Sequence, residues 1–177
     1  MKSFVLFVTV ITWLAPASPV PPDAKFPVPP ITANTLFYIQ RSSNANTVMY
    51  EVNRKGGQPI NIEDPVEVFW IRYAEKGQRR ELNYLERTLA YGIRCEATGK
   101  TGKYLMRFVA SKKRWAEVSL DVQGRAQALM SIDKKMSQLH KIFVQVTESG
   151  WLPRVEYVEF FGEDVITHQP TYERMII

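Results

Sequence analysis

The sequence contains a single cysteine, Cys95, so the chain has no second cysteine with which to form an internal disulfide. Cys95 lies in a stretch of strand-like composition, where an unpaired cysteine usually behaves as a small buried hydrophobe. A reactive thiol needs a neighbouring group that lowers its pKa, and the sequence places no histidine beside Cys95. We therefore predict that Cys95 is a structural residue of a strand.

Histidine is almost as rare, since His140 and His168 are the only two. A metal site needs several convergent His, Cys, Asp or Glu ligands, and the sequence offers no such spacing. A Gly-x-Ser-x-Gly nucleophile motif is also missing, and Gly99 and Gly102 are typical of a hairpin turn rather than of a phosphate-binding loop. We expect no metal ion and no cofactor, and these missing motifs favour a non-catalytic protein.

The sequence has no hydrophobic run long enough to cross a membrane, because the apolar residues 3–14 fall short of the about 20 residues that a span requires. Lys2 precedes this run and Ala15-Pro16-Ala17 follows it, an order typical of a secretory signal peptide and its cleavage site. We predict a signal peptide over residues 1–17 and an exported protein, periplasmic or extracellular, without a transmembrane span after cleavage. The alternative is a retained N-terminal anchor.

Proline is concentrated between residues 18 and 30, where it fixes φ and removes backbone donors. We expect residues 18–33 to form an extended linker that does not pack against the rest of the chain. Residues 34–177 are then a single β-rich domain of ordinary size, large enough to bury a core.

A stretch of alternating apolar residues at positions 66–74 is the strongest structural signal in the sequence. Val66, Val68 and Trp70 alternate with Phe69 and Ile71, so both faces of the predicted strand are apolar. Such a pattern is typical of a strand that is covered on two sides.

Arg72 shares a strand face with Trp70, two residues away. A buried guanidinium without a partner is costly. Arg72 therefore either meets a carboxylate, with Glu86 and Glu159 as candidates, or lies open to water and receives an anionic ligand.

The remaining elements are short strands separated by turn signals. We predict strands at residues 35–42, 47–53, 93–97, 104–110, 115–122, 126–131, 141–147, 155–161 and 172–177. Residues 112–114 are predicted as a charged turn or edge, and residues 132–140 as a helical turn or loop. Leu82, Leu85 and Leu89 are spaced by three and four, which predicts one amphipathic helix at about residues 79–91 with Gly92 as its C-cap. The fold class is mainly β, an antiparallel β-sandwich or barrel of about nine or ten short strands and this helix.

Three groups of residues resemble a known family. They are NTLFYIQRS (34–42) with NANTV (44–48), FWIRYAE (69–75) with AYGI (90–93), and WLPRVEYVE (151–159). Together they are similar to the domain of unknown function 4833 family, over roughly residues 34–161. The resemblance implies an exported bacterial protein, many members of this family being from Bacteroidetes, and it implies no particular activity, substrate or catalytic residue.

Aromatic and basic residues form the candidate binding site, because stacking surfaces and cationic donors together bind sugars, carboxylates or phosphates. The predicted ligand-binding residues are Trp70, Arg72, Tyr84, Arg87, Lys112, Arg114 and Trp151, with Tyr91 and Trp115 as further members of the group. The alternative for each is an ordinary structural role, in the core for an aromatic and in solvent for a cation.

Two functions remain open. The first is a non-catalytic binding or interaction domain of the cell envelope, with an anionic or carbohydrate ligand or an envelope protein as its partner. The second is a hydrolase of unrecognised type that acts on an envelope polymer. The formal net charge of +5 favours anionic partners but is too small to indicate nucleic acid binding.

Overall fold

The computed structural model describes residues 26–54, 59–147 and 154–177 of the chain. The predicted signal peptide, most of the proline-rich linker and Trp151 lie outside the described residues. In the described part, strands dominate, and the helical elements η1 (Tyr73–Glu75) and η2 (Glu86–Ala90) are short. The prediction of a mainly β protein is confirmed.

Eleven strands of the described chain belong to one continuous sheet. They are β1 (Thr35–Arg41), β2 (Asn44–Val52), β3 (Val66–Arg72), β4 (Gln78–Glu81), β5 (Ile93–Ala97), β6 (Tyr104–Phe108), β7 (Ser111–Leu120), β8 (Ala126–Ile132), β9 (Lys135–Thr147), β10 (Arg154–Asp164) and β11 (Pro170–Ile176). Their order is β4-β3-β2-β1-β9-β8-β7-β6-β5, and β10 pairs with both β9 and β11.

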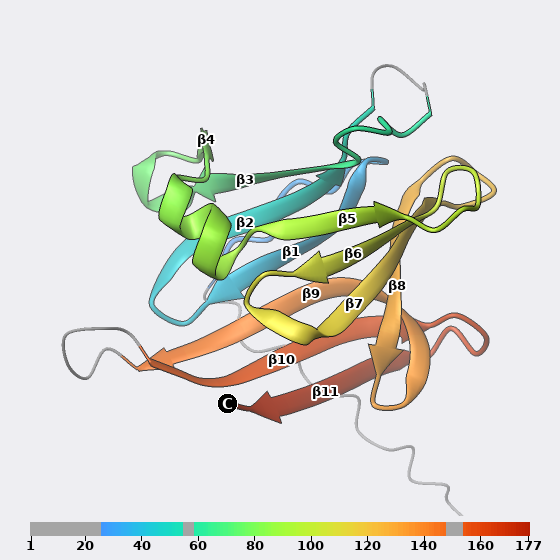
Figure 1. Ribbon diagram of the computed structural model, residues 1–177. Coiled ribbons are helices and arrows are strands. Elements are labelled where there is room, and N and C mark those ends of the chain that lie inside the picture. Colours follow the sequence, from blue (N-terminus) through green and yellow to red (C-terminus); the bar gives the residue numbers. More distant parts are fainter. Residues whose placement is uncertain (1–25, 55–58, 148–153) are drawn as a thin grey trace, which may run out of the picture.

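The sheet branches at β9, its longest strand (Figure 1). One edge of β9 pairs with β10 from Ser137 to Thr147. The other edge pairs first with β8 in antiparallel register and then with β1 in parallel register, residues 141–144 lying beside residues 38–41. The sheet curls into a half-barrel. Strands β1–β3 lie on one side of β9 in the strand order and β5–β8 lie on the other, and β9–β11 are at the bottom of the view in Figure 1. The parallel pair of β1 and β9 is a departure from the antiparallel pairing that the sequence predicts.

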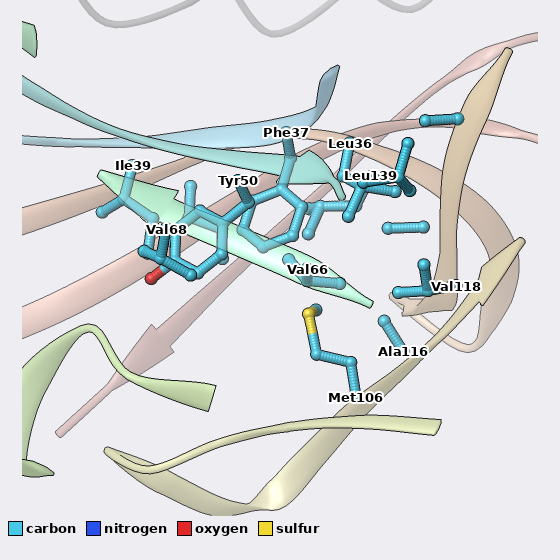
Figure 2. Close-up of a cluster of buried hydrophobic side chains, with 14 of the residues drawn as sticks. Leu36, Phe37, Ile39, Tyr50, Val66, Val68, Met106, Ala116, Val118 and Leu139 are labelled. Atoms are coloured by element: carbon cyan, nitrogen blue, oxygen red, sulfur yellow. The ribbon is translucent and has the colours of Figure 1, made fainter. Parts of the chain in front are cut away.

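The hydrophobic core fills the inside of this curl (Figure 2). Side chains of β1, β2 and β3 approach those of β6, β7 and β8 there. The rings of Phe37 and Tyr50 stack with their centroids 4.3 Å apart, and Phe108 meets Phe37 edge-on at 5.8 Å. Aromatic pairs in these geometries add stabilisation beyond the area that they bury.

The two apolar faces of β3 are both buried, as predicted. Val68 and Trp70 point into the core inside the curl. Phe69 and Ile71 form a second, smaller cluster with Met49 of β2 on the opposite face of the sheet.

The end of the proline-rich segment packs against the sheet. The ring of Phe26 lies 5.9 Å from that of Phe143, centroid to centroid. The side-chain amide of Gln40 donates a hydrogen bond of 2.8 Å to the carbonyl oxygen of Pro27, and Pro29 is buried. The prediction of an unpacked linker is therefore wrong for residues 26–29. These contacts satisfy a buried amide and cover an aromatic ring, which the proline content alone did not indicate.

The predicted helix at residues 79–91 is wrong in its first part and in its packing. Residues 79–81 belong to β4, which pairs with β3. The helical segment spans Tyr84 to Ala90 and includes the π-helical η2. Of its predicted apolar face, Leu82 is buried, whereas Leu85 and Leu89 are 64% and 70% exposed. The leucine spacing fits a helix but does not decide whether anything covers that helix.

Residues 135–140 are a strand, where the sequence predicted a helical turn or loop. They begin β9 after a tight turn in which Asp133 and Lys134 have φ of 47° and 65°. Two consecutive positive φ values are typical of a type I′ hairpin turn, which usually contains Asn or Gly. Residues 112–114, predicted as a turn or edge, lie within β7.

Among the described residues, no helix has the length and apolar character needed to cross a membrane.

Candidate functional site

Two arginines lie against one buried tryptophan at one end of the sheet. Arg41 and Arg72 are the last residues of β1 and β3, which run in the same direction on either side of β2. Their guanidinium carbons lie 5.2 Å and 5.0 Å from the ring centroid of Trp70. Tyr91 packs edge-on against the same ring, with centroids 5.0 Å apart. We call Arg41, Trp70, Arg72, Glu86 and Tyr91 the Trp70 site.

Glu86 connects the helical segment to Trp70. The indole Nε1 of Trp70 donates to Oε2 of Glu86 at 3.1 Å, and the backbone N–H of Asn83 donates to the same oxygen at 2.9 Å. In return, Oδ1 of Asn83 accepts a hydrogen bond of 2.9 Å from the backbone N–H of Glu86. This reciprocal pair is a capping box, in which the residue before a helix and the third residue of that helix satisfy each other's backbone donors. The local sequence Asn-x-x-Glu therefore positions the carboxylate that Trp70 binds.

Arg72 forms two long ion pairs with carboxylates, and neither contact is close enough for a hydrogen bond. Its Nη2 lies 3.8 Å from Oε1 of Glu86, and its Nη1 lies 3.9 Å from Oε1 of Glu75. Its Nε is buried and has no hydrogen-bond acceptor. Of the two partners predicted for Arg72, Glu86 is confirmed as an ion-pair partner, whereas Glu159 pairs with Arg174 of β11 at 2.7 Å.

Arg41 has even fewer acceptors. Its Nη1 donates to the hydroxyl oxygen of Tyr91 at 3.3 Å, and its Nε is buried without an acceptor. No carboxylate of the described segments lies within ion-pair distance of Arg41. A guanidinium carries five N–H donors, so most of the N–H groups of Arg41 and Arg72 have no hydrogen-bond acceptor in the described chain.

Burial keeps the two tyrosines of this region in the neutral form. It raises the pKa of Tyr50 well above the ordinary value, and it raises the pKa of Tyr91 even though the charge of Arg41 acts in the opposite direction. The hydroxyl of Tyr50 donates to the carbonyl oxygen of Tyr91 at 2.6 Å, which holds Tyr91 in place. The hydroxyl hydrogen of Tyr91 is therefore a further neutral donor beside the two guanidiniums.

The Trp70 site is suited to bind an anionic group. Guanidinium N–H groups form charge-assisted hydrogen bonds with carboxylates and phosphates, often in pairs. Trp70 itself is only 1% exposed, so it supports the arginines and does not present a stacking surface to a sugar.

Within the described segments, no three His, Cys, Asp or Glu side chains are grouped closely enough to hold a metal ion. A shallow depression elsewhere, between the ends of β9, β10 and β11, is lined by Thr147, Arg154, Val155, Glu156, Ile176 and Ile177 and shares no residue with the Trp70 site.

The structure brings together only part of the predicted binding group. Trp70 and Arg72 lie in the Trp70 site with Tyr91. Tyr84 and Arg87 are exposed on the adjoining helical segment, where Arg87 pairs with Glu81 at 3.4 Å.

The other predicted residues are separate from this site. Arg114 is in β7, where it donates to the carbonyl oxygen of Ser131 at 3.0 Å and pairs with Glu173 of β11. Lys112 belongs to the same strand, and Trp151 lies outside the described residues.

Arg41 is the member of the site that sequence analysis missed. It is the last residue of a predicted strand and is followed by a polar run, so it has the pattern of an exposed strand end. The only sequence signal for it is its alternation with Phe37 and Ile39, two residues of the same strand that belong to the core. That signal gives no sign that β1 and β3, on either side of β2, end at the same end of the sheet.

Cys95 lies in a strand, as predicted. Cys95 is half-buried in β5, and burial raises the pKa of its thiol to about 12. Both histidines are exposed, and Nδ1 of His168 lies 2.8 Å from Oε1 of Glu163.

The fold and this site define a β half-barrel domain with a cationic site at one end of its sheet. The chain belongs to the DUF4833 family, a domain of unknown function whose family model matches residues 37–174. This match confirms the family that the sequence resembles. Comparison with curated proteins and with solved structures gives no match.

Proposed function

We propose that this protein is an exported, non-catalytic binding domain that holds the carboxylate or phosphate group of a ligand at the Trp70 site. The observation that carries the proposal is the state of its two arginines. Both lie against Trp70, both have a buried Nε without an acceptor, and neither is hydrogen-bonded to a carboxylate of the described chain.

The carboxylates that pair with Arg72 are both shared with other donors. Oε2 of Glu86 already accepts from Trp70 and Asn83, so its charge is shared with other donors. Glu75 also pairs with Arg80, at 3.5 Å. An anion that reached Arg41 and Arg72 would therefore complete hydrogen bonds that the chain itself leaves open, and such charged hydrogen bonds contribute about 1.5–3 kcal/mol each.

A binding role is also supported by the way in which Glu86 is held. A general acid or base must be able to exchange a proton with a substrate. The capping box and the indole N–H instead fix Glu86 as a hydrogen-bond acceptor.

Citrate and inorganic phosphate are suitable probes for this proposal. In isothermal titration calorimetry we expect Arg41→Met and Arg72→Met each to weaken citrate binding by about tenfold or more, because each removes a charged hydrogen-bond donor. Arg125→Met is the matched control, since it removes the same charge from an exposed arginine that pairs with Asp121 at 2.9 Å.

Side-chain NMR gives a second measurement. The Nε–H signals of Arg41 and Arg72 should shift when citrate or phosphate is added, and that of Arg125 should not. The proposal would be contradicted if all three variants bound citrate as tightly as the original chain does. It would also be contradicted if Arg125→Met lost as much affinity as the other two variants.

A further inference from the structure

A row of two arginines and a tryptophan crosses the outer face of β5, β6 and β7. Arg94 of β5 lies directly opposite Arg107 of β6, and Arg107 lies directly opposite Trp115 of β7. Directly opposite residues in antiparallel strands point to the same side of the sheet, so the three side chains are neighbours. All three are exposed, and the Trp115 side chain is 47% exposed.

This arrangement is unfavourable for the domain on its own. Like charges directly opposite each other destabilise a pair of strands. The nearest carboxylate is that of Glu96, whose Oε1 lies 3.9 Å from Nε of Arg107, and both side chains are largely in solvent. Glu117 in the next row of β7 is already paired with Lys103 at 2.5 Å. The row therefore keeps an excess of positive charge beside an uncovered aromatic ring.

We propose that Arg94, Arg107 and Trp115 form a binding surface for an acidic polysaccharide. The indole ring offers an apolar face on which a sugar ring stacks, as aromatic side chains do in binding sites. The two guanidiniums offer paired N–H donors to sugar carboxylates. Adjacent strands are about 4.8 Å apart, a spacing similar to the length of one sugar unit along a polysaccharide. Successive sugars of one chain can thus meet Trp115, Arg107 and Arg94 in turn.

An anionic membrane surface is a weaker match to the same residues. Binding to a bilayer depends on several apolar side chains that enter the interface together with the cations. This row has one aromatic ring, and the next row across the strands is made of Glu96, Leu105 and Glu117. Those carboxylates would repel anionic lipid headgroups.

Polygalacturonate is the probe for this surface, and its methyl-esterified form is the matched uncharged polymer. In affinity electrophoresis of the full chain, we expect retardation by polygalacturonate and much less by the esterified polymer. Trp115→Ala and Arg107→Gln should each weaken binding by about tenfold, because each removes one stacking or charged contact. Arg125→Gln is the charge-matched control and should bind as the original chain does. Circular dichroism melting curves check that the variants remain folded.

Several results would overturn the inference. They are the absence of retardation, equal retardation by the esterified polymer, equal losses in Arg125→Gln, or binding to phosphatidylglycerol vesicles without binding to polygalacturonate. Arg41→Met separates this surface from the Trp70 site, which also takes carboxylates, because it should weaken polygalacturonate binding less than Trp115→Ala does. If Arg41→Met abolished that binding and Trp115→Ala did not, the polymer would belong to the Trp70 site and this inference would fail.

Discussion

Trp70 and Trp115 show how differently two tryptophans of one sheet are used. Trp70 is surrounded by the guanidiniums of Arg41 and Arg72, the ring of Tyr91 and the carboxylate of Glu86. Its N–H is satisfied and its ring is buried, so it combines a core role with the support of two cations. Trp115 lies on the outer face of β7, where much of its ring remains in water.

We expect Trp70→Ala to lower the free energy of unfolding by about 3–5 kcal/mol, the usual cost of removing a large buried aromatic side chain. Urea denaturation followed by circular dichroism measures this change. Trp115→Ala is the control, for which the expected loss is below about 1 kcal/mol because the side chain is half exposed. A Trp70→Ala midpoint equal to that of the original chain would show that the tryptophan does not stabilise the core.

Cys95 gives a prediction about pH. Burial raises the pKa of its thiol from 9.0 to about 12, so the reactive thiolate is scarce in the folded protein at ordinary pH. We expect iodoacetamide to alkylate Cys95 at least about a hundredfold more slowly in the folded chain than in urea at pH 8. The rate in urea should level off above pH 9, whereas the folded rate should continue to rise.

The same pKa shift affects stability. The unfolded chain releases the thiol proton at a lower pH than the folded chain does, so ionisation of Cys95 favours unfolding as the pH rises above 9.0. Cys95→Ala should reduce this loss of stability at high pH. Equal alkylation rates in the folded and unfolded chain would contradict the prediction.

At the scale of elements, the helical segment beside Trp70 depends on its two ends. Its start is set by the capping box of Asn83 and Glu86. Its end requires a glycine, because a Cβ at Gly92 would lie 1.7 Å from the carbonyl oxygen of Arg87. The sequence prediction identified Gly92 as the end of the helix, and a close backbone approach rather than a positive φ explains it.

We expect Asn83→Ala to lower the free energy of unfolding by about 1 kcal/mol, the usual contribution of an N-cap side chain. Asn83→Ser should restore most of that stability because serine is also a good N-cap. Gly92→Ala should cost more, above about 2 kcal/mol, since the backbone must move. Thermal melting of the three variants measures these differences, and an Asn83→Ala variant as stable as the original would argue against the capping box.

At the scale of the whole molecule, β9 holds the half-barrel together, because it pairs with β1, β8 and β10. The chain before β1 is tied to the same region through Phe26 and Phe143 and through Pro27 and Gln40. The folded body therefore extends at least to Phe26.

Export remains a prediction, since it depends on residues 1–17. We expect the mature chain to begin near Ser18, after cleavage behind Ala15-Pro16-Ala17. Such a chain keeps Phe26 and Pro27 and hence their contacts with the sheet. N-terminal sequencing of the protein from an expressing cell tests this, and an intact Met1 in the membrane fraction would instead indicate a retained anchor.

The sequence by itself determined the class of the fold and most of the strands. Alternation of apolar residues is a local property, so Val66 to Ile71 indicated a strand buried on both faces, and that strand is β3. The family resemblance also rests on runs of contiguous residues, and the match of the family model to residues 37–174 confirms it. Turn chemistry was less informative where Asp133 and Lys134 replace the usual Asn and Gly, and the first part of β9 was missed for that reason.

Only the tertiary structure decided which side chains meet. Arg41 and Arg72 are 31 positions apart in the sequence, and they share Trp70 because β1 and β3 run in the same direction beside β2. Arg94, Arg107 and Trp115 likewise form a row only through the register of three strands. The exposure of Leu85 and Leu89 depends on what lies next to their helical segment. Strand order, register and coverage arise from contacts between distant parts of the chain, and local periodicity carries no information about them.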